Sequence, residues 1–88
     1  MTVEFLQSFS RDTDKILRKS DRLKLLKLIT QIENANDLSG IAQVKKLAGY
    51  RTAYRIRLGD YRIGFFFENN KVIFARVLHR KEIYKLFP

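Results

Sequence analysis

The stretch YRIRLGDYRIGFFF, residues 54–67, alternates apolar and polar side chains on both sides of a Gly59-Asp60 step. Successive side chains of a β-strand point to opposite faces, so this alternation predicts two strands that each have one apolar face. Glycine as the first residue of a two-residue connection supplies the positive φ that a tight hairpin turn needs. Residues 53–58 and 61–68 are therefore predicted to form a β-hairpin.

The polar face of this hairpin carries arginines that repel one another. The predicted register sets Arg57 opposite Arg62, and Arg55 lies two residues along the same face. Like charges directly across a strand pair are destabilising, so these side chains either stay solvated or bind an anion. The residue opposite Arg55 is Gly64, which has no side chain and lets a backbone or a ligand come close. We pursue the anion hypothesis.

The positive charge is concentrated in the part of the chain that contains the hairpin. The net charge is +9, and residues 1–37 hold seven Lys and Arg against six Asp and Glu, whereas residues 38–88 hold eleven against three. A one-sided basic surface is typical of a protein that binds nucleic acid or an acidic protein. A cationic surface with no specific partner is the alternative.

Length and composition limit the class of protein. The 88 residues predict a single domain spanning 1–88, and the absence of cysteine excludes disulfides and thiolate metal sites. The chain has no acidic pair and no histidine cluster with ligand spacing, so neither a metal nor another cofactor is expected. No apolar run has the length of a signal peptide or a membrane span, so a cytoplasmic protein with no membrane contact is expected.

The N-terminal part reads as a strand followed by a short helix. Residues 2–6 alternate weakly, and Ser8 or Ser10 offers an N-cap for a helix with Asp12 and Asp14 in its first turn. The apolar stripe of this helix consists of Ile16 and Leu17.

A second helix and a connector follow. Ser20-Asp21 gives another capping signal, and the helix is predicted to end near residues 34–36, where Asn and Asp favour turns. Its apolar residues at helical spacing are Leu25, Leu28, Ile29 and Ile32. The connector, residues 37–49, has some strand character around residues 44–47.

The rest of the chain extends the hairpin into a meander. Asn69-Asn70 predicts a second tight turn, and residues 71–78 form a strand that is apolar on both faces apart from Arg76, as is typical of an interior strand. Residues 82–87 are predicted to form one closing helical turn. The predicted fold class is α+β, with two N-terminal helices packed on one face of a small twisted antiparallel sheet in the order β-α-α-β-β-β, and with the other face basic.

The segment His79-Arg80-Lys81-Glu82-Ile83-Tyr84 follows the last strand and holds the only histidine of the chain. If this strand lies beside the hairpin, the segment reaches the arginine face. Guanidinium groups bind phosphate bidentately and stabilise charge on a pentacoordinate phosphorus, while imidazole and phenol groups move protons. Such a site would cleave RNA without a metal by activating a 2′-hydroxyl against its own phosphate.

Two sets of side chains are candidates for this chemistry. The candidate catalytic residues are Arg55, Arg57, Arg62, His79, Arg80 and Tyr84, and the candidate substrate contacts are Lys45, Lys46, Phe66 and Lys81. Each has a structural alternative: the lysines belong to a solvated basic edge, His79 is a surface residue, Tyr84 caps the core, and a partner covers Phe66.

Two motifs together resemble a known family. The element order, with YRIRLGDYRI in the hairpin and RVLHRKEIY at the end of the last strand, resembles the RelE-type toxins of the RelE/ParE toxin–antitoxin superfamily. The resemblance covers essentially the whole chain and is most specific over residues 47–84. It implies a RelE-like fold and an mRNA interferase that cuts the codon in the ribosomal A site, leaving a cyclic phosphate and a 5′-hydroxyl. It also implies a cognate antitoxin that wraps the toxin in a hetero-oligomeric complex, and the basic surface indicates that this antitoxin is acidic.

The resemblance also assigns roles by position. Arg55 and Arg57 match two basic residues of the hairpin's first strand, and Arg62 matches a phosphate-binding arginine after the turn. Arg80 matches a basic residue past the last strand, and Tyr84 matches a tyrosine that orients or stacks on the substrate.

One departure from the family pattern concerns the general base. Well-studied members have lysines in the hairpin's first strand, and one of them is proposed to be the base. Arginine, with a pKa above about 12, does not readily take up a proton. His79, at a position where several relatives have histidine, and Tyr84 are the two alternatives for the base, and Arg55 becomes a phosphate clamp.

Two other functions remain open within the same superfamily. ParE-type toxins share the fold and an arginine-rich hairpin but inhibit DNA gyrase, and the HRKEIY segment favours the RelE type. A catalytically silent relative that only binds an antitoxin is the third possibility.

Overall fold

The computed structural model of the chain describes residues 1–16 and 18–88. It has the following elements: β1 (Thr2–Phe5), α1 (Gln7–Thr13), α2 (Lys19–Asn34), the 3-10 turn η1 (Leu38–Gly40), β2 (Val44–Lys46), β3 (Ala53–Leu58), β4 (Tyr61–Glu68), β5 (Lys71–His79) and α3 (Ile83–Leu86). The predicted hairpin, the third strand of the meander, the helix end near residue 34 and the closing helical turn are confirmed. Among the described residues, no helix has the length and apolar character needed to cross a bilayer.

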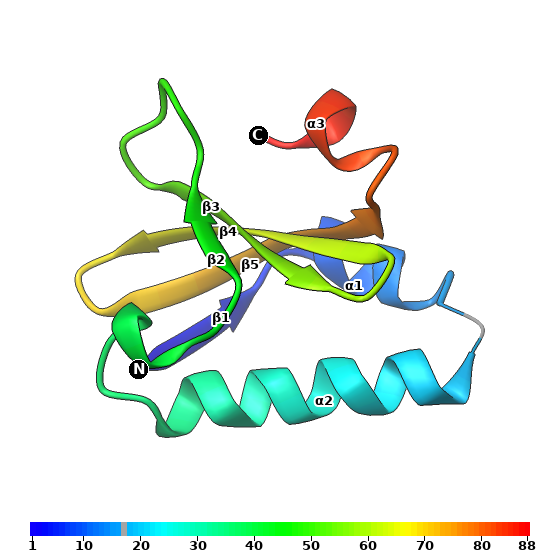
Figure 1. The fold of residues 1–88 in the computed structure, drawn as a ribbon, viewed down its shortest axis with the longest axis horizontal. Coiled ribbons are helices and arrows are strands. Elements are labelled where there is room, and N and C mark those ends of the chain that lie inside the picture. The colour runs from blue at the N-terminus through cyan, green and yellow to red at the C-terminus, as the bar shows by residue number, and fades with distance from the viewer. Residues whose placement is uncertain (17) are drawn as a thin grey trace.

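The strands form one twisted sheet with the order β1-β5-β4-β3-β2, and helices lie on both sides of it (Figure 1). β2 to β5 pair antiparallel, whereas β1 pairs parallel with β5, so β5 is an interior strand as predicted. The weak strand character of residues 44–47 corresponds to β2, which lies at the sheet edge. The α+β class is confirmed, and the sheet has a fifth strand and one parallel pairing.

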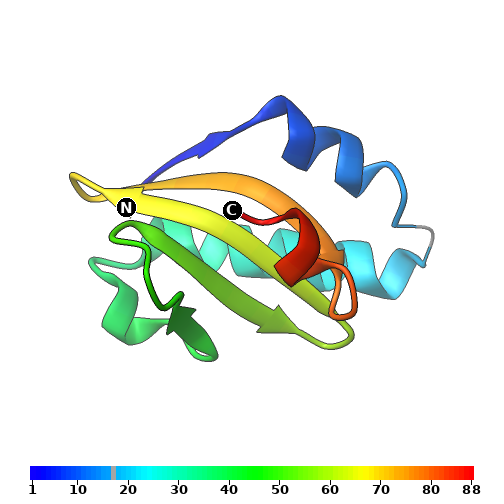
Figure 2. The same cartoon turned by 90° about the horizontal axis from the view of Figure 1, so that it is seen from above.

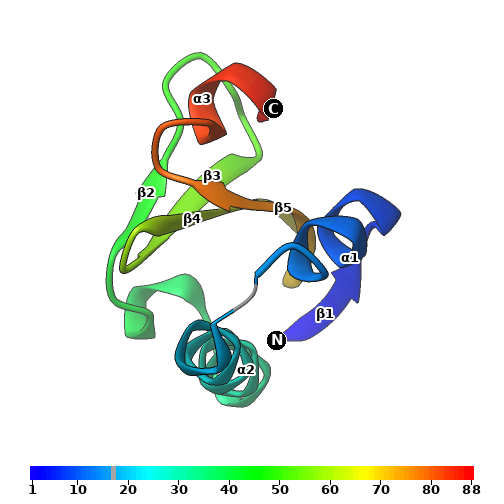
Figure 3. The same ribbon diagram turned by 90° about the vertical axis from the view of Figure 1, so that its right-hand side faces the viewer.

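The main core lies between the sheet and the two N-terminal helices. Seen end-on, α2 runs beneath the sheet, and α1 lies at the β1–β5 side (Figure 3). The buried side chains of this core are Phe9, Ile16, Leu25, Leu28, Ile32, Ile41, Ile56, Ile63, Phe65, Val72, Phe74 and Val77. Both helices therefore bury their apolar residues against the same sheet face, as expected; Leu17, the other residue of the predicted apolar stripe, lies outside the described residues.

The start of α1 differs from the prediction. The helix begins at Gln7 with Leu6 as its N-cap, and neither Ser8 nor Ser10 caps it. The Ser8 hydroxyl instead donates to the carbonyl of Ala75, at 2.6 Å. The pairing of β1 with β5 ends at Phe74, and beyond it the free edge of β5 binds α1 and sets its position.

Asp12 is the residue that fixes α1 to this edge. It lies in the last turn of α1, not the first, and is 4% exposed. Its carboxylate accepts a hydrogen bond from the backbone N–H of Val77 at 3.1 Å and pairs bidentately with Arg76, with Nε–Oδ2 at 2.7 Å and Nη2–Oδ1 at 3.1 Å. This hydrogen bond with Asp12 raises the pKa of Arg76.

The second face of the sheet is not wholly basic, which corrects the prediction. Viewed from above, α3 and the C-terminus lie over β4 and β5 (Figure 2). They close a smaller core of Leu47, Ala53, Ala75, Ile83 and Phe87, with Phe66 and Leu78 partly buried at its margin. The arginine side chains occupy the rest of this face, toward the β3–β4 turn.

Candidate anion-binding site

The hairpin register places the arginines as predicted. Arg57 pairs with Arg62 across β3 and β4, and Arg55 pairs with Gly64. The turn between the strands is formed with Gly59 at a φ of 59°. The like-charged pair therefore exists in the folded protein.

Arg62 is held in place by the turn that precedes it. Its Nη1 donates to the carbonyls of Gly59 and Tyr61, both at 2.9 Å. Burial lowers the pKa of Arg62, and the charges of Arg57 and Arg55 lower it further. Among the described residues its Nε and Nη2 have no acceptor, so this edge of the guanidinium is free to bind an anion.

Tyr84 reaches the arginines from α3. Its hydroxyl accepts a hydrogen bond from Nε of Arg55 at 3.2 Å, and Nη1 of Arg55 donates to the carbonyl of Gln43 at 3.3 Å. Tyr84 is 62% exposed, so the alternative in which its ring caps the core is wrong. α3 thus places a phenol beside the first arginine of the hairpin.

Arg80 approaches the same group from the end of β5. Its backbone N–H donates to the carbonyl of Asp60 at 2.8 Å, which ties the segment after β5 to the β3–β4 turn. Its charge also contributes to lowering the pKa of Arg62, after burial and the other two arginines. Lys81 is exposed in the turn that follows.

We call Arg55, Arg57, Arg62, Arg80 and Tyr84 the arginine cluster. Within residues 1–16 and 18–88, the ion pairs shorter than 4 Å are Arg18–Asp21, Lys71–Glu4 and Arg76–Asp12, so no carboxylate neutralises the cluster. Keeping like charges together without a counterion is unfavourable unless they are solvated or meet an anion. The cluster is therefore the candidate site for a negatively charged ligand.

His79 does not join the cluster, which corrects the prediction. It pairs with Tyr61 at the end of β5, and the two rings lie edge to face with centroids 6.3 Å apart. It lines a small hollow of about 150 Å³ on the helix side of the sheet together with Asp12, Lys15 and Ile16. Its Nδ1 accepts the backbone N–H of Lys81 at 3.2 Å. The sheet separates its ring from the arginines.

The two candidate lysines of β2 lie on opposite faces of the sheet. Lys45 pairs with Arg55, so it shares the arginine face, whereas Lys46 pairs with Tyr54 and lies on the opposite face. Strand alternation therefore removes Lys46 from the cluster. The ring of Phe66 packs against that of Phe87, with centroids 5.2 Å apart, so the chain itself covers one side of it.

Two contributions were not foreseen from the sequence. The first is the carbonyl of Gln43, which accepts from the Arg55 side chain and from the N–H of Arg57; this residue has a φ of 67°. The second is the packing of Phe87 on Gly64. A glutamine in the left-handed conformation has no strong sequence signal, because Asn and Gly are the residues that usually mark it.

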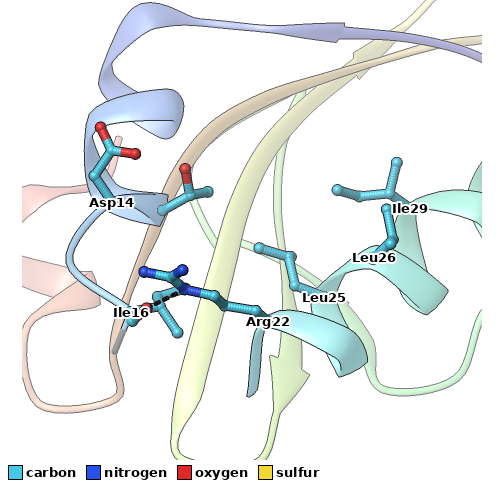
Figure 4. A pocket seen from close by; sticks show the side chains of 7 residues that line it. Asp14, Ile16, Arg22, Leu25, Leu26 and Ile29 are labelled. Atoms are coloured by element: carbon cyan, nitrogen blue, oxygen red, sulfur yellow. Dashed lines mark hydrogen bonds between the residues drawn. The ribbon is translucent and has the colours of Figure 1, made fainter. Parts of the chain in front are cut away.

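Another hollow, of about 350 Å³, lies away from the cluster between the end of α1 and the first half of α2 (Figure 4). Its lining is mostly apolar, with Leu25, Leu26 and Ile29 on one side and Asp14 on the other, and Arg22 bonds across it to the carbonyl of Ile16. In the part of the chain that the structure describes, no three His, Asp or Glu side chains gather as metal ligands.

Comparison with known proteins agrees with this architecture. A family model described as "ParE toxin of type II toxin-antitoxin system, parDE" matches residues 3–84. Toxin RelE3 of Methanocaldococcus jannaschii is 42% identical over 92 residues, which cover all of both chains. The chain belongs to the RelE/ParE toxin family. Within that family it is a RelE-type toxin.

Solved structures extend the similarity to three dimensions. This RelE-type toxin has 39% identity and a TM-score of 0.82 to a chain of the RelB-RelE antitoxin-toxin complex from Methanococcus jannaschii, covering 97% of this chain and 99% of that one. A chain of the archaeal RelE-RelB complex from Pyrococcus horikoshii shares the fold at 21% identity, with a TM-score of 0.71 over 93% of this chain and 97% of that one.

Proposed function

We propose that this RelE-type toxin is a ribosome-dependent endoribonuclease that cuts mRNA in the A site without a metal. The observation that carries the proposal is the arginine cluster itself: within residues 1–16 and 18–88 its four arginines have no carboxylate partner, and one of them, Arg55, donates to the Tyr84 hydroxyl. The bound anion would be the scissile phosphodiester. A toxin that acts on ribosomes works in the cytoplasm.

The reaction is an attack of the 2′-hydroxyl on the adjacent phosphorus. The new O–P bond closes a 2′,3′-cyclic phosphate, and the bond to the 5′-oxygen of the next nucleotide breaks. Negative charge grows on the phosphorus oxygens in the transition state, and fixed guanidinium groups stabilise it. The free edge of Arg62 is oriented for this role by its two bonds to the turn carbonyls.

Tyr84 is the proton-transfer group of this proposal. A hydroxyl has one donor position and two acceptor positions, and the bond from Arg55 occupies one acceptor position. The remaining acceptor position can take the proton of the 2′-hydroxyl, and the O–H can supply a proton to the leaving 5′-oxygen. His79 has no part in the step, because it lies on the other face of the sheet.

Substitution of the two candidate bases separates their roles. Tyr84→Phe is expected to lower the single-turnover cleavage rate on programmed ribosomes about 10²-fold, since general acid–base catalysis contributes about 10²–10⁴-fold. His79→Gln is expected to leave both that rate and its pH profile near neutrality unchanged. A loss of activity in His79→Gln that matches Tyr84→Phe would contradict the assignment.

The function itself is tested by mapping new 5′ ends on an mRNA translated in a cell-free system with and without the protein. Cuts within A-site codons that disappear when ribosomes are omitted are the expected result. An intact message after incubation with folded protein would rule the proposal out.

Gyrase inhibition is the second candidate, because the matching family model is described as a ParE toxin. A supercoiling assay at micromolar protein decides it. Inhibition of supercoiling with no mRNA cleavage would establish the second function, and the absence of both activities would leave a silent antitoxin-binding protein.

We further propose that an acidic antitoxin binds this toxin and covers the arginine cluster. The unpaired positive charge gives the surface, and the similar chain in the Methanococcus jannaschii structure is in a complex with RelB. Binding is expected to weaken as salt rises from about 0.05 to 0.5 M, because salt screens exposed charge pairs. The slope should be shallower for Arg55→Gln/Arg57→Gln, measured by calorimetry with the co-encoded partner. Equal slopes for the two proteins would count against this account.

A further inference from the structure

Tyr84 lies on a helix that is too short to be stable without tertiary contacts. α3 spans Ile83–Leu86, and isolated helices of this length do not form in water. Its position must come from the two residues of this segment that are buried against the sheet, Ile83 at 0% exposed and Phe87 at 4% exposed. The N–H of Phe87 also donates to the carbonyl of Ile83 at 2.8 Å, which closes the turn that contains Tyr84 between the two buried residues.

The Phe87 ring is seated directly on the backbone of Gly64. A Cβ added to Gly64 would lie 2.5, 2.6 and 2.8 Å from Cδ2, Cγ and Cε2 of that ring, closer than carbon atoms approach one another. Gly64 does not have a left-handed φ, so its lack of a side chain serves this contact and no backbone turn. The ring of Phe66 also packs against the Phe87 ring.

The same glycine is the cross-strand partner of Arg55. The backbone of Gly64, on which the Phe87 ring packs, therefore lies beside Arg55, the residue that donates to the Tyr84 hydroxyl. At the sequence level Gly64 suggests close approach of a backbone or a ligand; the group that approaches is the C-terminal aromatic ring of the same chain.

We propose that Phe87 and Gly64 are positioning residues: the ring seated on the glycine holds α3 so that the Tyr84 hydroxyl meets Arg55. This inference rests on the proposed ribonuclease function. Cleavage then depends on Phe87, a side chain outside the arginine cluster, through the placement of the Tyr84 hydroxyl.

The test begins with Gly64→Ala, in which the added methyl displaces the ring. Small misplacements of catalytic groups cost about 10–100-fold, so the cleavage rate should fall by that factor. Gly40→Ala is the matched control, because Gly40 has no atom within 4 Å of an added Cβ and no positive φ. Phe87→Leu, which removes the ring without a clash, should also lower the rate. This second variant tests the inference even if Gly64→Ala does not fold.

A double-mutant cycle separates positioning from general damage. In the Tyr84→Phe background there is no hydroxyl left to position, so Gly64→Ala should have no further effect on the rate. In addition, Phe87→Leu combined with Gly64→Ala should recover part of the activity, since the smaller side chain leaves room for the methyl. An equal loss in both backgrounds, or full activity of folded Gly64→Ala, would overturn the inference.

A second readout does not depend on activity. The Arg55 Nε–H should exchange slowly with solvent in ¹⁵N NMR spectra of the wild type and of Gly40→Ala, and fast in Gly64→Ala. If the wild type shows this protection but cuts no RNA, the proposed function fails while the positioning contact stands. If protection is unchanged in Gly64→Ala, the positioning contact itself is wrong.

Discussion

Replacing Arg62 with alanine is expected to lower the rate of mRNA cleavage about 10²–10³-fold and to leave the fold intact. Removing one fixed group that stabilises transition-state charge costs about 2.7–4 kcal/mol, which corresponds to that factor. The fold should tolerate the change, because among the described residues Arg62 bonds only to the backbone carbonyls of Gly59 and Tyr61 and pairs with no carboxylate. Loss of its charge also relieves repulsion with Arg57 and Arg55.

The measurement is single-turnover cleavage on programmed ribosomes, with circular dichroism and thermal unfolding to establish that the variant is folded. Arg11→Ala is the control for the change of net charge, since Arg11 is an exposed arginine on α1, away from the hairpin. A folded Arg62→Ala protein that cuts at the wild-type rate would remove this residue from the catalytic assignment.

Replacing Asp12 with alanine is expected to give the largest loss of stability, about 3 kcal/mol in the free energy of unfolding. The change leaves the Arg76 guanidinium, whose side chain is 24% exposed, without its anion, and it leaves the buried N–H of Val77 without an acceptor. Breaking a buried pair costs about 3–5 kcal/mol, and the partial exposure of Arg76 places this one at the lower end.

Urea unfolding followed by circular dichroism measures this loss. The control is Glu4→Ala, which breaks the Glu4–Lys71 pair, with side chains 53% and 39% exposed; exposed pairs contribute about 0–1 kcal/mol. Equal losses in Asp12→Ala and Glu4→Ala would mean that Asp12 does not fasten α1 to β5.

The hairpin was predictable because its register is local. The turn at Gly59 fixes which residues of the two strands lie opposite each other, and strand alternation fixes the face on which each side chain lies. The Arg57–Arg62 pair therefore follows from the sequence alone. The bounds of β3 and β4 were predicted for the same reason. The start of α1 was not predicted, because the Ser8 hydroxyl bonds to the Ala75 carbonyl of β5 and does not cap the helix.

The face occupied by His79 depends on a feature that no local pattern reveals. The pairing of β4 with β5 shifts between Gly64 and Phe65, so that Ala75 is an extra residue between Phe74 and Arg76. Without this bulge, His79 would fall on the opposite face from Phe74, beside the arginines; with it, Val77 and His79 return to the core side. Because this one-residue bulge places His79 on the face away from the arginines, Tyr84 is the remaining candidate for proton transfer.

The parallel pairing of β1 with β5 sets the order in which the protein can be completed. The first strand is synthesised before any other element, yet its partner β5 is the last strand of the sheet to be synthesised. Chain segments that need late partners remain incomplete during synthesis. The hydrogen bonds between β1 and β5 can therefore form only after α1, α2 and the other three strands have been synthesised, so the closure of this edge of the sheet is a late step in the folding of the chain.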